Sequence, residues 1–156
     1  MAFRCGGGGR GGFGGNGMKH AARKALLVDD EAVNRMALAR LLRQAGVATV
    51  DEAADGTEAL VKAGAAVYDV VICDIDMHPM DGITFLRALR SRGDGPNGRT
   101  PVVMLSKYSS GGMLQAARDA GAAAYIVKPV GRDDLADKLA RVAPALGEAM
   151  EEAGGR

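Results

Sequence analysis

Five short apolar segments alternate with helix-like segments along this chain, and this alternation limits the possible folds more than any other feature. The apolar segments are Ala25–Val28, Val47–Ala53, Val70–Cys73, Pro101–Leu105 and Ala123–Val127. Short apolar runs bounded by turn residues are typical of buried strands. Because alternating strands and helices form right-handed βαβ units, the pattern predicts a single α/β domain whose parallel sheet is covered by helices on both faces.

The segments between these runs have the apolar spacing of amphipathic helices. After the first run, a 3.6-residue period places on one face Val33, Met36, Ala37, Leu41 and Leu42. The later helices are predicted over Thr57–Ala66, from Ile83 to before Ser91, over Gly111–Ala120, and in a last segment that ends at Pro144. Glycine residues and a proline between Ser91 and Thr100 predict an irregular loop there.

The composition is that of an ordinary globular protein, with 156 residues, 47% hydrophobic content and a formal net charge of +1. This charge gives no general attraction to nucleic acid or to anionic lipid, so neither direct DNA binding nor membrane association is expected. The two cysteines, Cys5 and Cys73, do not form a disulfide framework, and Cys73 is expected in the core. With no apolar run long enough to span a bilayer and no signal peptide, the sequence predicts a cytoplasmic protein.

The ends of the chain differ in composition from its middle. Residues 1–23 are rich in glycine and predict a disordered tail, with too few arginines for strong RNA binding. The folded domain is expected over residues 24–146. Residues 147–156 predict a short flexible C-terminal tail.

Charged and hydroxyl side chains stand where the predicted strands end. Asp29 and Asp30 follow the first strand, Asp74 the third, Ser106 the fourth and Lys128 the fifth. The carboxyl ends of parallel strands share one edge of the sheet, where ligands of open α/β sheets bind. Clustered carboxylates repel one another unless a hard cation such as Mg²⁺ neutralises them. With a lysine and a hydroxyl beside Asp74, the pattern predicts phosphoryl transfer to a carboxylate.

Each of these residues also has an ordinary structural explanation. Asp29 and Asp30 could cap the helix that follows them, and Ser106 could be a turn hydroxyl. Lys128 could be a surface charge and Tyr125 a core aromatic. Their common position at one edge of the sheet favours a shared site.

The segments Val28–Glu31, Asp74–Gly82 and Tyr125–Pro129, with Ser106 between the last two, resemble the receiver domain of two-component response regulators. The resemblance covers about Lys24–Leu146, which is the whole predicted domain. It implies a doubly wound, flavodoxin-like (βα)5 fold with strand order 2-1-3-4-5.

The resemblance also implies a function for the acidic residues. Asp74 would be the phosphoacceptor, and a histidine kinase or a histidine phosphotransfer protein of a two-component or phosphorelay system would be the donor. Asp29 and Asp30 would hold Mg²⁺ together with Asp74 and the backbone carbonyl of Asp76. The resemblance thus implies a signalling receiver that promotes only its own phosphorylation and dephosphorylation.

The resemblance also implies a conformational switch that responds to phosphorylation. Ser106 and Lys128 would bind the phosphoryl oxygens, and Tyr125 would turn inward on phosphorylation. The face formed by helix 111–120, strand 123–127 and the last helix would then change and control a downstream partner protein. The Lys128–Pro129 bond is expected to be cis. Since the acidic end after Leu146 is too short for a DNA-reading domain, a stand-alone regulator similar to chemotaxis receivers is expected.

Two residues depart from the family pattern, and two others stand where the family tunes dephosphorylation. His78 stands where a proline is usual, with Pro79 one place later, so a shifted turn beside an intact site is expected. Lys107 stands where a small residue is usual and could hinder access to the site, contact the phosphoryl group or extend into solvent. Asp76 and Tyr108 occupy positions that tune dephosphorylation in the family.

Two other functions fit parts of the sequence. Asp74-Ile75-Asp76 resembles the Asp-x-Asp of haloacid dehalogenase phosphatases, which also form an aspartyl phosphate. The chain order argues against this, because in that superfamily the nucleophile ends the first strand and the acidic pair comes late. A receiver-like interaction module that is never phosphorylated is the second alternative.

Overall fold

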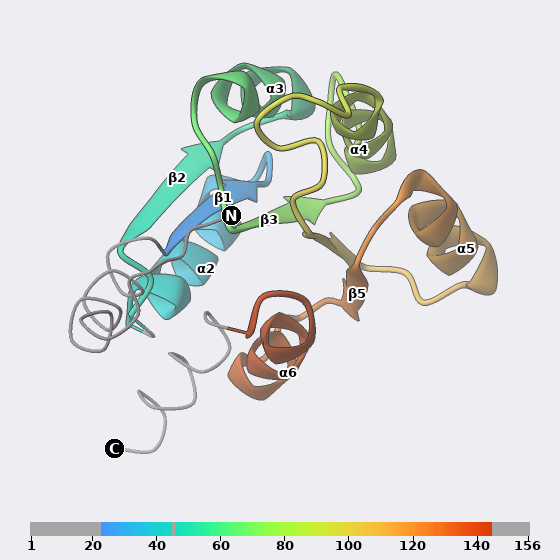
Figure 1. Cartoon of the computed structure of the whole chain (residues 1–156). Coiled ribbons are helices and arrows are strands. Elements are labelled where there is room, and N and C mark those ends of the chain that lie inside the picture. The colour runs from blue at the N-terminus through green and yellow to red at the C-terminus, as the bar shows by residue number, and fades with distance from the viewer. Residues whose placement is uncertain (1–22, 45, 145–156) are drawn as a thin grey trace.

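The computed structural model describes residues 23–44 and 46–144. One parallel sheet has the strand order β2-β1-β3-β4-β5 (Figure 1). Its strands are β1 (Lys24–Val28), β2 (Thr49–Ala53), β3 (Val70–Asp74), β4 (Val102–Ser106) and β5 (Ala124–Val127). The helices are α2 (Ala32–Gln44), α3 (Gly56–Ala65), α4 (Gly82–Ser91), α5 (Gly111–Ala120) and α6 (Arg132–Val142). The predicted fold and strand order are confirmed.

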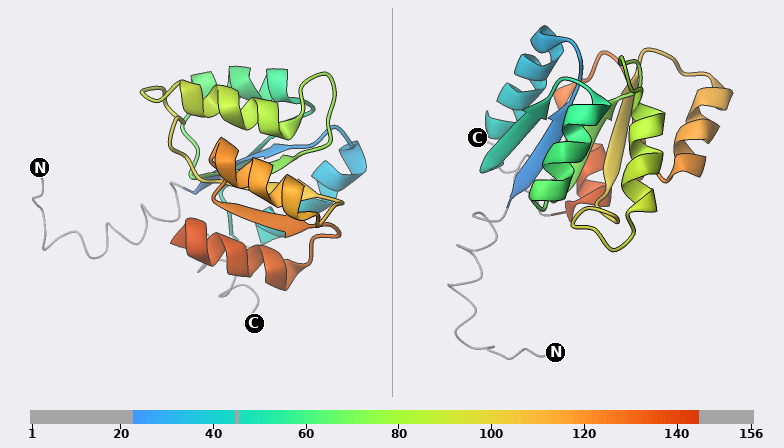
Figure 2. Two further views of the ribbon diagram at one scale, coloured as in Figure 1. Left: turned by 90° about the vertical axis from the view of Figure 1, so that its right-hand side faces the viewer. Right: turned by 90° about the horizontal axis from the view of Figure 1, so that it is seen from above.

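Two hydrophobic cores lie on opposite faces of this sheet. Helices α3, α4 and α5 cover one face, side by side in the right view of Figure 2, and α2 and α6 cover the other. Along β1, Leu26 and Val28 pack into the first core, whereas Ala25 and Leu27 pack into the second. Because both faces are covered, the central strands β3 and β4 are buried throughout and are nearly continuous apolar runs.

Helix α2 packs against the sheet with a stripe that overlaps only partly with the predicted one, since Leu42 is buried and Leu41 packs against the core as expected. Its buried residues are Leu38, Ala39 and Leu42, whereas Val33 and Met36 are 78% and 64% exposed. Both stripes have helical spacing. Periodicity alone therefore identified the helix but could not decide which apolar stripe faces the sheet.

The first described residue, Arg23, belongs to the predicted N-terminal tail. Arg23, the last residue of the predicted N-terminal tail, is buried, and its carbonyl oxygen accepts a hydrogen bond from Thr49 N at 3.2 Å. The folded part thus includes one residue of that tail. The predictions for residues 1–22 and 145–156 lie outside the described residues. No helix within the described ranges is long and apolar enough to cross a membrane.

Candidate functional site

Three carboxylates meet at the carboxyl edge of the sheet. Parallel pairing of Val28 with Cys73 brings Asp29 and Asp74 side by side at the ends of β1 and β3. Asp29, Asp30 and Asp74 each offer an oxygen, and these oxygens lie within 4.8 Å of one another. The first and third are buried while Asp30 is exposed, so the acidic cluster has a closed base and an open side.

Asp74 is the residue of this cluster with the most perturbed environment. Its Oδ1 is buried and pairs with Lys128 Nζ at 3.2 Å, and no other donor among the described residues reaches this oxygen. Burial raises the pKa of Asp74 to about 6, against the opposing effect of Lys128 and with smaller contributions from Asp29 and Asp76. Because a carboxylate oxygen can accept more than one contact, Oδ1 can take a further partner.

Lys128, at the end of β5, bridges the two buried carboxylates. Its Nζ lies 3.2 Å from Asp74 Oδ1 and 3.5 Å from Asp29 Oδ2. Burial lowers the pKa of Lys128, but the two carboxylates outweigh burial and the net pKa is raised. The side chain thus stays charged at neutral pH. The Lys128–Pro129 bond is cis, which confirms the prediction.

Ser106 connects the site to the aromatic residues beside it. Its buried Oγ accepts a hydrogen bond from Tyr108 N at 3.1 Å, which leaves the hydroxyl proton free to be donated. The carbonyl oxygen of Tyr108 in turn accepts from the hydroxyl of half-buried Tyr125 at 2.8 Å. A chain of two hydrogen bonds therefore runs from the end of β4 to β5.

The loop from Asp74 to helix α4 is held against the end of β3. Gly82 N donates to Ile75 O at 2.9 Å, and a Cβ atom on Gly82 would clash with the carbonyl oxygen of Asp74. Asp81 caps α4 by accepting from Thr84 N at 2.8 Å. Only glycine allows this close approach, which explains why glycine stands eight residues after Asp74, the last residue of β3.

The residues that depart from the family pattern lie around the site. The Asp76 side chain is exposed and lies outside the acidic cluster of Asp29, Asp30 and Asp74. The His78–Pro79 bond is cis. Lys107 is exposed and, with Lys128, lines a groove of about 530 Å³ against helix α2.

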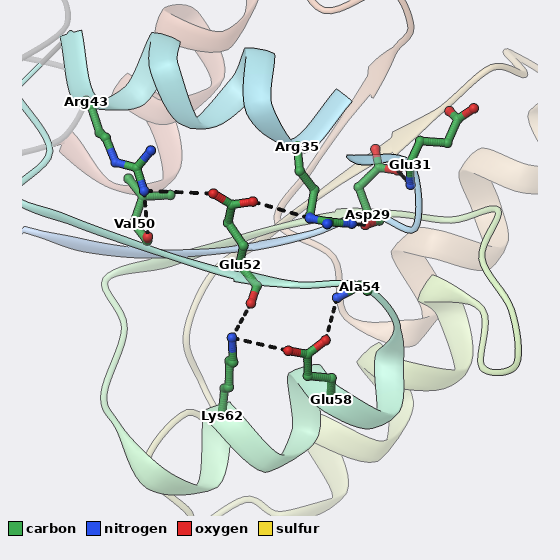
Figure 3. A network of polar contacts seen from close by, with 9 residues as sticks. All are labelled: Asp29, Glu31, Arg35, Arg43, Val50, Glu52, Ala54, Glu58 and Lys62. Atoms are coloured by element: carbon green, nitrogen blue, oxygen red, sulfur yellow. Dashed lines mark hydrogen bonds and ion pairs between the residues drawn. The ribbon is translucent and has the colours of Figure 1, made fainter. Parts of the chain in front are cut away.

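Sequence reasoning missed Arg35, which contacts the site from helix α2. Its Nη1 donates to the Asp29 carbonyl oxygen at 2.6 Å, and its Nε pairs with Glu52 Oε1 at 3.3 Å (Figure 3). In the sequence Arg35 is one of several charges on an amphipathic helix, and no motif distinguishes it. Only the tertiary structure brings Arg35 to the loop after β1 that carries Asp29 and Asp30.

The donor set fits a magnesium ion. Mg²⁺ is bound by one or two carboxylates, with water and phosphate oxygens completing its coordination. The acidic cluster supplies such oxygens at the open edge of the sheet. The unsatisfied Asp74 Oδ1 also provides an acceptor that a cation could use.

Comparison with known proteins agrees with this geometry. The model of the response regulator receiver domain matches residues 25–140. The transcriptional regulatory protein PdtaR of Mycobacterium tuberculosis is 41% identical over 113 residues, which are 72% of this chain and 53% of that protein. The chain thus spans about half the length of this relative.

Solved structures show the same architecture. Chemotaxis protein CheY4 of Vibrio cholerae is 38% identical with a TM-score of 0.72, over 77% of this chain and 98% of that one. The receiver domain of sensor histidine kinase PA1611 from Pseudomonas aeruginosa, which has a magnesium ion in its active site cleft, is 28% identical with a TM-score of 0.70, over 79% and 98% of the two chains. With its family match, strand order and acidic edge, the chain belongs to the response regulator receiver domain family of two-component systems.

Proposed function

We propose that this receiver accepts a phosphoryl group on Asp74 from a phosphohistidine donor, in a reaction that depends on Mg²⁺. The donor would be a histidine kinase or a histidine phosphotransfer protein. The observation that carries the proposal is the buried Asp74 Oδ1, whose only polar partner in the described part of the chain is Lys128 Nζ at 3.2 Å. A nucleophilic oxygen held only by a cation is suited to gain a covalent anionic group.

In the proposed step, an Asp74 carboxylate oxygen attacks the phosphorus atom as the bond from phosphorus to the donor's imidazole nitrogen breaks. The electron pair of that bond stays on the imidazole nitrogen, which takes a proton from solvent. Lys128 pairs with the phosphoryl oxygens, and the Ser106 hydroxyl donates to one of them. A Mg²⁺ ion held by the acidic cluster and the Asp76 carbonyl would neutralise charge on the carboxylates and the phosphoryl oxygens.

The raised pKa of Asp74 has a direct consequence for this step. At a pKa of about 6 the carboxylate is ionised at neutral pH and still retains the nucleophilicity of a poorly solvated anion. Burial, the cause of this shift, thus keeps water away from the nucleophile without preventing its ionisation at neutral pH.

The Ser106–Tyr108–Tyr125 chain gives the proposed switch a route. When Ser106 turns to donate to a phosphoryl oxygen, its Oγ moves away from Tyr108 N, and the backbone of Tyr108 loses one of its two contacts. Tyr125 can then leave the Tyr108 carbonyl and turn inward. The α5–β5–α6 face would change accordingly and control a partner protein.

Membership in the receiver family favours this function over a phosphatase of the haloacid dehalogenase type. Steady turnover of a small phosphomonoester would reverse that preference. A receiver that acts as an unphosphorylated interaction module would take up no phosphoryl group at all. The following experiment separates these functions.

The test is incubation of the protein with acetyl phosphate and Mg²⁺, followed by mass spectrometry of the intact chain and its peptides. We expect one phosphoryl group on Asp74, no uptake in EDTA, and complete loss of uptake in Asp74→Asn. Asp94→Asn, which changes an exposed aspartate in the loop before β4, is the matched control and should be labelled like the wild type. Undiminished labelling of Asp74→Asn would show that another residue is the acceptor.

A further inference from the structure

We infer that Arg35 is a positioning residue for the Mg²⁺ site, because it fixes the peptide from which Asp29 and Asp30 extend. The inference rests on the proposed function, since it concerns the metal that this function requires. Figure 3 shows Arg35 on α2 between the acidic loop after β1 and Glu52 on β2. Arg35 itself would not bind the metal or the phosphoryl group.

The backbone of Asp29 is held on both sides. Its N–H donates to Ala53 O on β2 at 3.1 Å, and its carbonyl oxygen accepts from Arg35 Nη1 at 2.6 Å. Its side-chain Oδ1 accepts from Glu31 N at 2.8 Å. The Asp29 carbonyl belongs to the peptide that joins Asp29 to Asp30, so its orientation sets the direction in which Asp30 leaves the strand.

The guanidinium of Arg35 is itself held from the far side. Its Nε lies 3.3 Å from Glu52 Oε1, and the Arg35 side chain is only 19% exposed. Lys62 Nζ donates to the backbone carbonyl of Glu52, which anchors β2 at this residue. A planar guanidinium can donate to a carbonyl and a carboxylate at the same time, in fixed directions. Strand β2 thereby determines where the Asp29 carbonyl points.

The two possible roles of Arg35, as a nearby charge or as a positioning residue, predict opposite changes in Mg²⁺ affinity when it is replaced. A cation near a Mg²⁺ site repels the metal, so loss of the Arg35 charge alone would strengthen Mg²⁺ binding. Loss of a positioning contact would weaken it instead. Residues that orient metal ligands from outside the coordination sphere typically change metal affinity by about 10-fold to 100-fold when removed. The sign of the change therefore distinguishes the two roles.

Helix α2 also offers a matched control for this test. Arg43 lies on the same helix, and its Nη2 lies 3.8 Å from Glu52 Oε2 and 3.2 Å from Val50 O. It pairs with the same carboxylate as Arg35, but in the described part of the chain its polar contacts are with Val50 and Glu52 and not with Asp29. Arg43→Met therefore removes the same charge from the same network and leaves the Asp29 carbonyl bond in place.

The experiment is a Mg²⁺ titration of the full chain followed by backbone ¹H–¹⁵N NMR, which reports affinity and folding together. We expect Arg35→Met to raise the Mg²⁺ dissociation constant about tenfold, and Arg43→Met to change it by less than about twofold. Arg35→Lys should recover only part of the loss, since an ammonium lacks the planar fork that reaches both acceptors. Glu52→Gln, which keeps the Arg35 contact to Asp29, should cost about threefold.

Two outcomes would overturn the inference: Mg²⁺ binding by Arg35→Met that equals or exceeds that of the wild type, or equal weakening in Arg43→Met. If Arg35→Met does not give a folded spectrum, Glu52→Gln and Arg35→Lys decide, and unchanged affinity in both would equally overturn it. The proposed function fails separately, because wild-type protein that neither binds Mg²⁺ nor takes phosphate from acetyl phosphate would reject the function itself.

Discussion

Two buried polar side chains at opposite edges of the sheet have different surroundings. At the amino edge, the loop between α4 and β4 inserts Asn97, which is 1% exposed, beneath the end of α3. At the carboxyl edge, Asp74 is 3% exposed and lies beside the like charge of Asp29 and the opposite charge of Lys128. Every polar atom of the Asn97 side chain is paired, whereas Asp74 Oδ1 has only the Lys128 ion pair among the described residues.

Asn97 uses its whole side chain in hydrogen bonds. Its Oδ1 accepts from Tyr68 N at 2.8 Å and from Thr100 Oγ1 at 2.9 Å, and its Nδ2 donates to Ala63 O and Ala66 O, each at 2.6 Å. The network joins α3, the start of β3 and the loop before β4. A satisfied buried network of this kind stabilises one arrangement of the chain.

Asp74 differs, since the only partner of its buried Oδ1 within residues 23–44 and 46–144 is the Lys128 ammonium. Buried polar groups in folded proteins are nearly always paired, and Arg23 Nε is the other buried side-chain atom of these residues that has no hydrogen bond. The Asn97 network therefore stabilises the fold, whereas burial of the Asp74 carboxylate beside a like charge costs stability. Three measurements test this contrast.

The largest effect is expected at the amino edge. Asn97→Ala leaves buried donors and acceptors on Tyr68, Ala63 and Ala66 without partners, which should lower the free energy of unfolding by about 4 kcal/mol. Urea unfolding measures the change, and Asn34→Ala on α2 is the control, because the only side-chain hydrogen bond of Asn34 within the described residues is to Glu31. A loss below about 1 kcal/mol would mean that the Asn97 network contributes little to the free energy of unfolding.

The second effect is a pH dependence at the carboxyl edge. The pKa of Asp74 is about 6 in the folded protein and 3.8 for the free side chain, so between these values the folded state binds more protons than the unfolded state. Stability contributed by this group is therefore lost as the pH rises through 6. Relative to Asp74→Asn, the wild type in EDTA should lose about 2 kcal/mol between pH 4.5 and 8. If the difference in stability between the wild type and Asp74→Asn does not change with pH, the pKa of Asp74 is not raised in the folded protein.

The smallest effect is the recovery that Mg²⁺ provides. At a concentration ten times its dissociation constant, the ion should raise the free energy of unfolding by about 1.4 kcal/mol. Thermal or urea unfolding with and without Mg²⁺ measures the increment. Asn97→Ala should show the same increment, because its network lies at the other edge, whereas Asp74→Asn should show little. A reduced increment in Asn97→Ala would mean that the two edges are coupled.

Much of the fold and site follows from the sequence by local rules. Short apolar runs alternating with helical periods determined the parallel sheet, and the residues that end those runs identified Asp29, Asp30, Asp74, Ser106 and Lys128. This inference works because parallel strands end at one edge whatever their detailed packing. The strand order came from the family resemblance and is confirmed by the structure.

Only the tertiary structure decided which contacts hold those residues in place. Arg35 reaches Glu52 across 17 positions and Asn97 reaches Ala63 across 34, and no local pattern predicts such partners. The face that α2 buries and the raised pKa of Asp74 likewise depend on packing between distant segments. The sequence by itself determined which chemical groups meet at the edge of the sheet, whereas long-range hydrogen bonds and burial decided their orientation and charge.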